Sequence, residues 1–159
     1  MTTAFPPRGP VTPYWAMKVT GGLGLALRVA LHFLGVWPAG AAPLPLVIGQ
    51  GLVLVGAGIN IQHYRFLKRQ NPNIASPGFL EAEKGFYRWI RHPMYFGDLL
   101  LMIGLALLAP DLVSALLLAI GTVGVGIQSR IEDALMARMF GESFEAWRKR
   151  TRLLIPGIF

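Results

Sequence analysis

Residues Gly85 to Asp98 read GFYRWIRHPMYFGD, a basic and aromatic segment that runs directly into an apolar one. Arginine, tryptophan and tyrosine are typical of the bilayer surface, and proline is favoured in the first turn of a helix. The stretch therefore predicts that a polar segment ends, and a membrane-crossing helix begins, near Pro93. An interfacial anchor would account for these residue types, but residues elsewhere in the chain indicate more than an anchor.

The composition of the whole chain agrees with an integral membrane protein. Of 159 residues, 53% are hydrophobic and only 14% are charged, unlike a soluble domain of this length. The net charge of +7 lies beside apolar segments, so lipid headgroups are a nearer partner than nucleic acid. The absence of cysteine excludes a disulfide framework, a thiolate nucleophile and a cysteine metal site. We expect a single membrane domain over residues 1–159, with no metal ion and no cleavable signal peptide.

Four apolar stretches predict helices that cross the bilayer, which takes about 20 residues per crossing. Two short turns join these stretches in pairs, so the expected fold is an all-α membrane protein built from two helical hairpins. Between the hairpins lies a polar loop, and after them a C-terminal helical region that includes an amphipathic helix at the interface. The expected spans are residues 15–37, 44–62, 94–109 and 112–128, the loop is 63–93, and the C-terminal region is 129–159.

The amphipathic helix is predicted from apolar residues that fall on or near one face, with an interruption expected at Gly141-Glu142. These apolar residues are Ile131, Leu135, Met139 and Phe140.

Positive charge predicts the orientation of these helices. Six lysine and arginine residues lie in the loop 63–93, six lie between Arg130 and Arg152, and none lies in the two short turns. Such residues are enriched in cytoplasmic segments. Both termini and the central loop are therefore expected in the cytoplasm.

Lys18 lies near the start of the first predicted span, where it can snorkel, but Arg28, His32 and Asp98 lie inside the predicted spans, where they are costly in lipid. Arg28 and His32 are four residues apart and share one helix face, which we expect to be turned towards a protein partner or a thinned bilayer. Asp98 is expected to pair with Arg28 or His32, with substrate contact as the second interpretation. Glycines in the span 44–62 predict close helix contact, either within the chain or across a homodimer.

The motifs of the second half resemble those of a known family. They are, in order, Gly85-Phe86-Tyr87, Arg91-His92-Pro93-Met94-Tyr95-Phe96-Gly97, Glu132-Asp133-Ala134-Leu135, Phe140-Gly141 and Leu154-Ile155-Pro156. This order resembles the isoprenylcysteine carboxyl methyltransferases and phospholipid methyltransferases. The resemblance covers about residues 79–156, and the first two spans match only as generic membrane helices. It implies an integral membrane enzyme that uses S-adenosyl-L-methionine.

The resemblance also implies which residues contact the methyl donor. They are Tyr87, His92, Pro93, Met94, Tyr95 and Glu132, together with Phe79, Leu80, Glu81 and Ala82. His92 and Glu132 are the catalytic candidates, through positioning. In the prenylcysteine enzymes an arginine one turn before the acid is assigned to the substrate carboxylate. This chain has Gln128 there and Arg130 two positions on, which argues against a prenylcysteine carboxylate, and Gln128, Arg130 and Asp98 are the substrate-binding candidates.

The chemistry of the donor matches these residue types. S-adenosylmethionine carries a sulfonium, an ammonium and a carboxylate, which call for aromatic faces, an acid and hydrogen-bond donors. Methyl transfer is an in-line displacement that needs positioning and exclusion of water but no nucleophilic side chain. Only an amine acceptor must lose a proton, for which His92, Glu132 and Asp98 are the candidate bases.

The predicted function is methyl transfer at the cytoplasmic membrane face to a lipophilic acceptor that arrives laterally between helices. The acceptor is a prenylated thiol or carboxylate, a phospholipid amine, or a small hydrophobic thiol. One alternative is a small four-helix membrane transporter that works as a dimer, although such transporters usually carry an acid in their first span. The other is an NADPH-dependent sterol-type reductase, whose members are generally longer.

Overall fold

The computed structural model of the protein describes residues 11–40, 42–70 and 85–157. In these ranges every regular element is helical, apart from one isolated parallel bridge between Ile90 and Arg152. The all-α class predicted from the sequence is confirmed. The helices are α1 (Pro13–Phe33), α2 (Pro43–Gln70), the short 3-10 turn η1 (Gly85–Arg88), α3 (Pro93–Leu108) and α4 (Leu112–Arg150).

Local residues set where the helices begin. Thr12 caps α1, because its hydroxyl oxygen accepts the backbone N–H of Trp15 at 3.1 Å. Asp111 caps α4 in the same way and accepts the backbone N–H of Ser114 at 2.8 Å. That bond, followed by the bonds and charge of Arg28, holds the pKa of the Asp111 carboxyl below its usual range. The predicted start of the third helix at Pro93 is confirmed.

Two helices extend beyond the predicted membrane spans. The helix α2 does not end at residue 62 but continues through His63 to Gln70, and α4 continues past 128 as far as Arg150. Hydrophobicity marks where a helix leaves an apolar environment, whereas Arg, Lys, Leu and Gln sustain a helix in water as well. The expected interruption is confirmed at Gly141, whose φ of 51° breaks the helical backbone inside α4.

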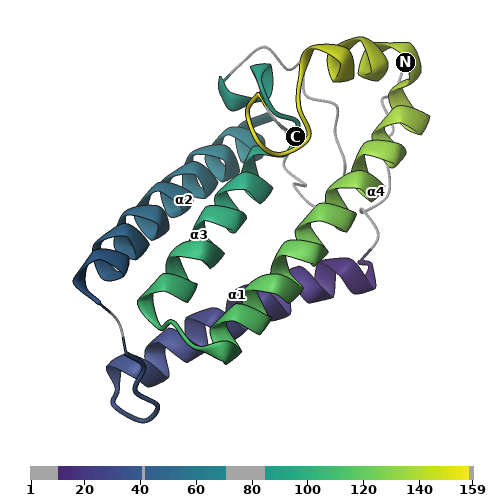
Figure 1. Cartoon of the computed structure of the whole chain (residues 1–159). Coiled ribbons are helices and arrows are strands. Elements are labelled where there is room, and N and C mark those ends of the chain that lie inside the picture. The colour runs from purple at the N-terminus through teal and green to yellow at the C-terminus, as the bar shows by residue number, and fades with distance from the viewer. Residues whose placement is uncertain (1–10, 41, 71–84, 158–159) are drawn as a thin grey trace.

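The helices pack in pairs that differ from the expected hairpins. The most extensive contacts join α2 to α3 and α1 to α4 (Figure 1). A side chain at Gly56 would meet the carbonyl oxygen of Gly97 at 2.6 Å, and one at Gly49 would meet that of Gly104 at 2.8 Å. These glycines therefore serve contact within the chain, as one of the two interpretations predicted. The homodimer stays a prediction.

Length and composition support a membrane location for part of this fold. Among the described helices, α2 over Pro43–Phe66 and α4 are long and apolar enough to cross a bilayer, and α3 is apolar but shorter. Crossing by α1 and α3, and placement of the C-terminal part of α4 at an interface, stay predictions. The apolar face of that part differs from the expected one, because Phe144 and Trp147 are its buried residues and only Phe140 of the predicted set packs against them.

The polar residues inside the predicted spans find partners other than those expected. The buried Arg28 donates from Nε to Asp111 at 2.8 Å and from Nη1 to the carbonyl oxygen of Trp37 at 2.7 Å. The Nδ1 atom of His32 accepts the backbone N–H of Ala39 at 3.0 Å. The predicted pairing of Asp98 with Arg28 or His32 is wrong, because Arg28 pairs instead with Asp111, the residue that caps α4.

Candidate active site

The candidate site forms where the first turn of α3 meets the middle of α4. The hydroxyl of Tyr95 donates a 2.6 Å hydrogen bond to Oε1 of Glu132, which lies 37 residues away in sequence. This contact exists because α4 runs on past residue 128 and carries Glu132 to the level at which α3 begins. The expected meeting of these two motifs is confirmed.

Gln128 supports this carboxylate from one helical turn below. Its amide donates to Oε1 of Glu132 at 2.9 Å, and its carbonyl oxygen accepts a short hydrogen bond from the hydroxyl of Thr12. Gln128 is only 1% exposed, and both ends of its side-chain amide bond to other residues of the chain. Arg130, predicted beside it as a substrate contact, is exposed, since positions two apart do not share a helix face.

His92 is held between the two acids of α4. Its ring stacks on Tyr95 with centroids 5.5 Å apart and planes inclined by 14°. Its Nε2 atom lies 3.0 Å from Oδ1 of Asp133, and its Nδ1 atom lies 3.6 Å from Oε2 of Glu132. Each ring nitrogen of His92 therefore faces a carboxylate oxygen. The ring orientation is thereby fixed from two sides.

Sequence reasoning assigned no role to Asp133, although it links two neighbouring residues of the motif. Its Oδ2 atom accepts from Nε of Arg91 at 2.8 Å, while Oδ1 faces His92. The Arg91 and Asp133 side chains are 9% and 12% exposed, so this is a mostly buried ion pair. Helical spacing alone could not reveal this ion pair. It shows that the two adjacent acids point in different directions, but it does not show which acid faces the motif.

The C-terminal segment after α4 is hydrogen-bonded to the backbone just before α3. The backbone N–H groups of Arg91 and His92 donate to the carbonyl oxygens of Arg152 and Leu153 at 2.8 and 3.1 Å. Arg91 also donates from Nη1 to the carbonyl oxygen of Thr151 at 2.9 Å. The segment containing the closing Leu-Ile-Pro motif therefore fixes the backbone of His92.

The remaining donor-binding candidates are placed as follows. Tyr87 is buried in an aromatic cluster, where Nε1 of Trp147 donates to its carbonyl oxygen at 3.1 Å. Burial, followed by the negative charge of Glu132, raises the pKa of the Tyr87 phenol, so it stays neutral. Pro93 is buried and Met94 half-buried at the start of α3. The predicted contacts Phe79, Leu80, Glu81 and Ala82 lie outside the described residues.

Asp98 lies one turn beyond Tyr95 and forms an ion pair with Lys18 of α1. The Nζ atom of Lys18 is 3.0 Å from Oδ2 of Asp98 and 4.6 Å from the centre of the Tyr95 ring. The side-chain amide of Asn60 on α2 donates to Oδ1 of Asp98 at 2.7 Å. The preferred interpretation of Asp98 as a paired residue is confirmed, with Lys18 as its partner.

The residue types of the cluster fit a cationic methyl donor. The Tyr95 face already accommodates one cation, the Lys18 ammonium, which shows that its ring is placed for such contact. Glu132 offers a carboxylate whose side chain is still 29% exposed. In the described part of the chain, no group of three or more His, Asp or Glu side chains is arranged to hold a metal ion.

The fold and site together define a class of helical, membrane-associated proteins whose polar site lies where an apolar helix begins. Comparison with known proteins gives the family. The sequence model of the phospholipid methyltransferase family matches residues 44–143, and the chain belongs to this family. The match includes α2, so the second span is more than the generic membrane helix expected from the sequence.

A relative is known in Schizosaccharomyces pombe, a protein-S-isoprenylcysteine O-methyltransferase. The two sequences are 30% identical over 116 residues, which is 70% of this chain and 46% of the relative. The chain therefore spans about half the length of this curated relative. No solved structure matches the chain.

Proposed function

We propose that this protein transfers a methyl group from S-adenosyl-L-methionine to a lipophilic acceptor at the cytoplasmic face of a membrane. The observation that carries the proposal is the hydrogen bond between Tyr95 and Glu132, which joins the two motif blocks. Membership of the phospholipid methyltransferase family and the identity with a protein-S-isoprenylcysteine O-methyltransferase support it.

The donor supplies an activated methyl group on a cationic sulfur. The residues of this chain bind and orient it: Tyr95 and His92 provide an aromatic wall, and Glu132 provides a fixed negative charge. Gln128, itself held by Thr12, holds the Glu132 carboxylate, and Asp133 holds the His92 ring. Since these groups are already bonded to one another, little reorganisation is needed when the donor binds.

The position of the site suits reactants of opposite solubility. A water-soluble donor reaches it from the polar side, and a lipophilic acceptor reaches it along the apolar helices. We propose that all four helices cross the membrane and that both termini lie in the cytoplasm, because lysine and arginine gather on the side of the site. The acceptor classes in question are a prenylated thiol or carboxylate, a phospholipid amine and a small hydrophobic thiol.

Calorimetric titration of the detergent-purified protein with S-adenosylhomocysteine tests the donor assignment. We expect saturable binding that is weakened at least tenfold by Glu132→Gln, which removes the negative charge, and by Tyr95→Phe, which removes the hydroxyl that bonds to the carboxylate. The matched control is Glu145→Gln on the same helix, which is expected to leave binding unchanged. NADPH is titrated in parallel to test the reductase alternative.

Two results would overturn the assignment. One is the absence of S-adenosylhomocysteine binding by a protein whose thermal unfolding is normal. The other is binding that Glu132→Ala and Tyr95→Ala leave unaffected.

A further inference from the structure

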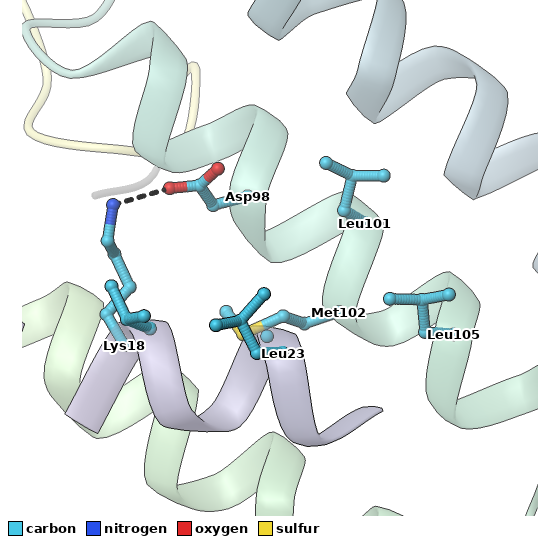
Figure 2. Close-up of a pocket in the computed structure, with 8 residues that line it drawn as sticks. Lys18, Leu23, Asp98, Leu101, Met102 and Leu105 are labelled. Carbon is cyan, nitrogen blue, oxygen red and sulfur yellow. Dashed lines mark hydrogen bonds and ion pairs between the residues drawn. The ribbon is translucent and has the colours of Figure 1, made fainter. Parts of the chain in front are cut away.

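A cavity of about 290 Å³ lies between α1 and α3 beside the candidate site (Figure 2). Small-molecule pockets usually measure about 300–1,000 Å³, so this cavity suits a single apolar chain rather than a whole two-chain lipid. It is lined by Lys18, Val19, Gly22, Leu23, Asp98, Leu101, Met102 and Leu105.

The cavity has one charged end and an apolar body. Figure 2 shows Lys18 reaching from α1 to Asp98 on α3, with Leu101 and Leu105 following farther along α3. The charged end is also the end nearest the candidate site, because the Lys18 ammonium lies over the Tyr95 ring. An amphiphile bound with its tail among the leucines would therefore place its head beside Tyr95.

The charged end favours an anionic head. Both oxygens of Asp98 already accept hydrogen bonds, one from Lys18 and one from Asn60. An ammonium has three N–H donors, and within the described residues Lys18 donates a single hydrogen bond, to Asp98. The side chain of Lys18 is also 18% exposed. The Asp98 side chain is 26% exposed, but each of its oxygens already has a donor, whereas, among the described residues, two N–H donors of Lys18 remain for an anionic head.

We propose that this cavity binds the apolar chain of the methyl acceptor and that Lys18 binds an anionic oxygen group, a carboxylate or a phosphate, at the acceptor's head. The role of the ligand as methyl acceptor rests on the proposed function, whereas its recognition rests on the cavity and Lys18. The proposal excludes a neutral hydrophobic thiol as the preferred acceptor. It also gives Lys18 a role that no sequence motif of the chain indicates.

The test is calorimetric titration of the full chain in detergent, without a methyl donor, using three amphiphiles with the same eight-carbon tail. Octanoate carries a carboxylate, octyl phosphate carries a phosphate, and octanol is neutral; titration into empty micelles is subtracted. We expect octanoate or octyl phosphate to bind about ten- to a hundredfold more tightly than octanol, the value of a hydrogen bond to a charged group. The stronger of the two identifies the head chemistry.

Matched variants separate the head from the tail. Lys18→Gln is expected to remove the preference for the anionic amphiphiles, and Lys18→Arg is expected to keep it. Lys68→Gln is the control, since Lys68 lies over the Tyr64 ring on α2, outside the cavity. Gly22→Leu fills the cavity and is expected to abolish binding of all three amphiphiles. Its control is Gly51→Leu on α2, because an added Cβ meets no atom within 4 Å at either glycine.

Three results would overturn the proposal: equal binding of octanoate, octyl phosphate and octanol, binding unchanged by Lys18→Gln, or binding unchanged by Gly22→Leu. Tighter binding of octyltrimethylammonium than of both anionic amphiphiles would assign the head to Asp98 and equally overturn it. Titration with S-adenosylhomocysteine keeps the two proposals apart. Anion-dependent amphiphile binding without S-adenosylhomocysteine binding refutes the proposed function alone, and the reverse result refutes the acceptor site alone.

Discussion

Replacing Asp133 by asparagine tests whether one carboxylate holds the motif at the start of α3. The change keeps the size of the side chain but removes the charge that faces Arg91 at 2.8 Å and His92 at 3.0 Å. Breaking a buried ion pair by removing one partner costs about 3–5 kcal/mol, because the other charge is left unpaired. Arg91 keeps its bond to the carbonyl oxygen of Thr151, so we expect the free energy of unfolding to fall by about 3 kcal/mol, the lower end of this range.

Thermal unfolding in detergent, followed by tryptophan fluorescence, measures this loss. Trp147 is buried beside Tyr87 and reports on the region directly. For a chain of this size, 1 kcal/mol corresponds to about 2–4 °C, so Tm is expected to fall by about 6–12 °C. The matched control is Glu145→Gln, another acid on α4 whose arginine pair is exposed and contributes about 0–1 kcal/mol.

The double variant Arg91→Met with Asp133→Asn sharpens the test. Since it leaves no unpaired buried charge, it is expected to lose less stability than the sum of the two single variants. The reasoning is refuted if Asp133→Asn lowers Tm by no more than Glu145→Gln, whose exposed pair corresponds to about 0–4 °C. Strict additivity of the two single changes would refute it as well.

Two further predictions concern the helix pairs and their orientation. Gly56→Ala is expected to lower Tm by several degrees, because its Cβ would meet the carbonyl oxygen of Gly97 at 2.6 Å, whereas Gly51→Ala has open space and is expected to leave Tm unchanged or raise it. Equal shifts would contradict this packing. A labelling reporter at Pro110 is expected to react only from the side opposite the cytoplasm, and reaction from the cytoplasm would reverse the proposed topology.

Much of the fold follows from apolar stretches and helix signals in the sequence. Pro93 marks the start of α3, and Gly141 marks the break in α4. What the sequence does not give is which helices become neighbours. Short turns predicted two hairpins, but close glycine contacts pair α2 with α3 and α1 with α4 instead. Glycine spacing shows that a helix face is suited to close contact, but it does not show which helix packs against that face.

The candidate site was predictable only in part for a similar reason. Motif order drew attention to Tyr95 and Glu132, which the structure joins. Lys18 and Asp133 escaped notice because each, taken alone, has an ordinary explanation as a snorkelling lysine or a solvated acid. Their partners lie 80 and 42 residues away, and only the fold brings them together.

The site lies along the seam between the two helix pairs, and this position explains its composition. Within each pair, glycine backbones approach too closely for a ligand to enter. Between the pairs, contact is less extensive, and polar side chains complete it: Lys18 of α1 with Asp98 of α3, and Tyr95 of α3 with Glu132 of α4. These polar side chains keep further hydrogen-bonding capacity for a ligand, whereas the glycine contacts leave no space for one. The seam is therefore where the fold can admit the proposed methyl donor and the head of the proposed acceptor without separating its helix pairs.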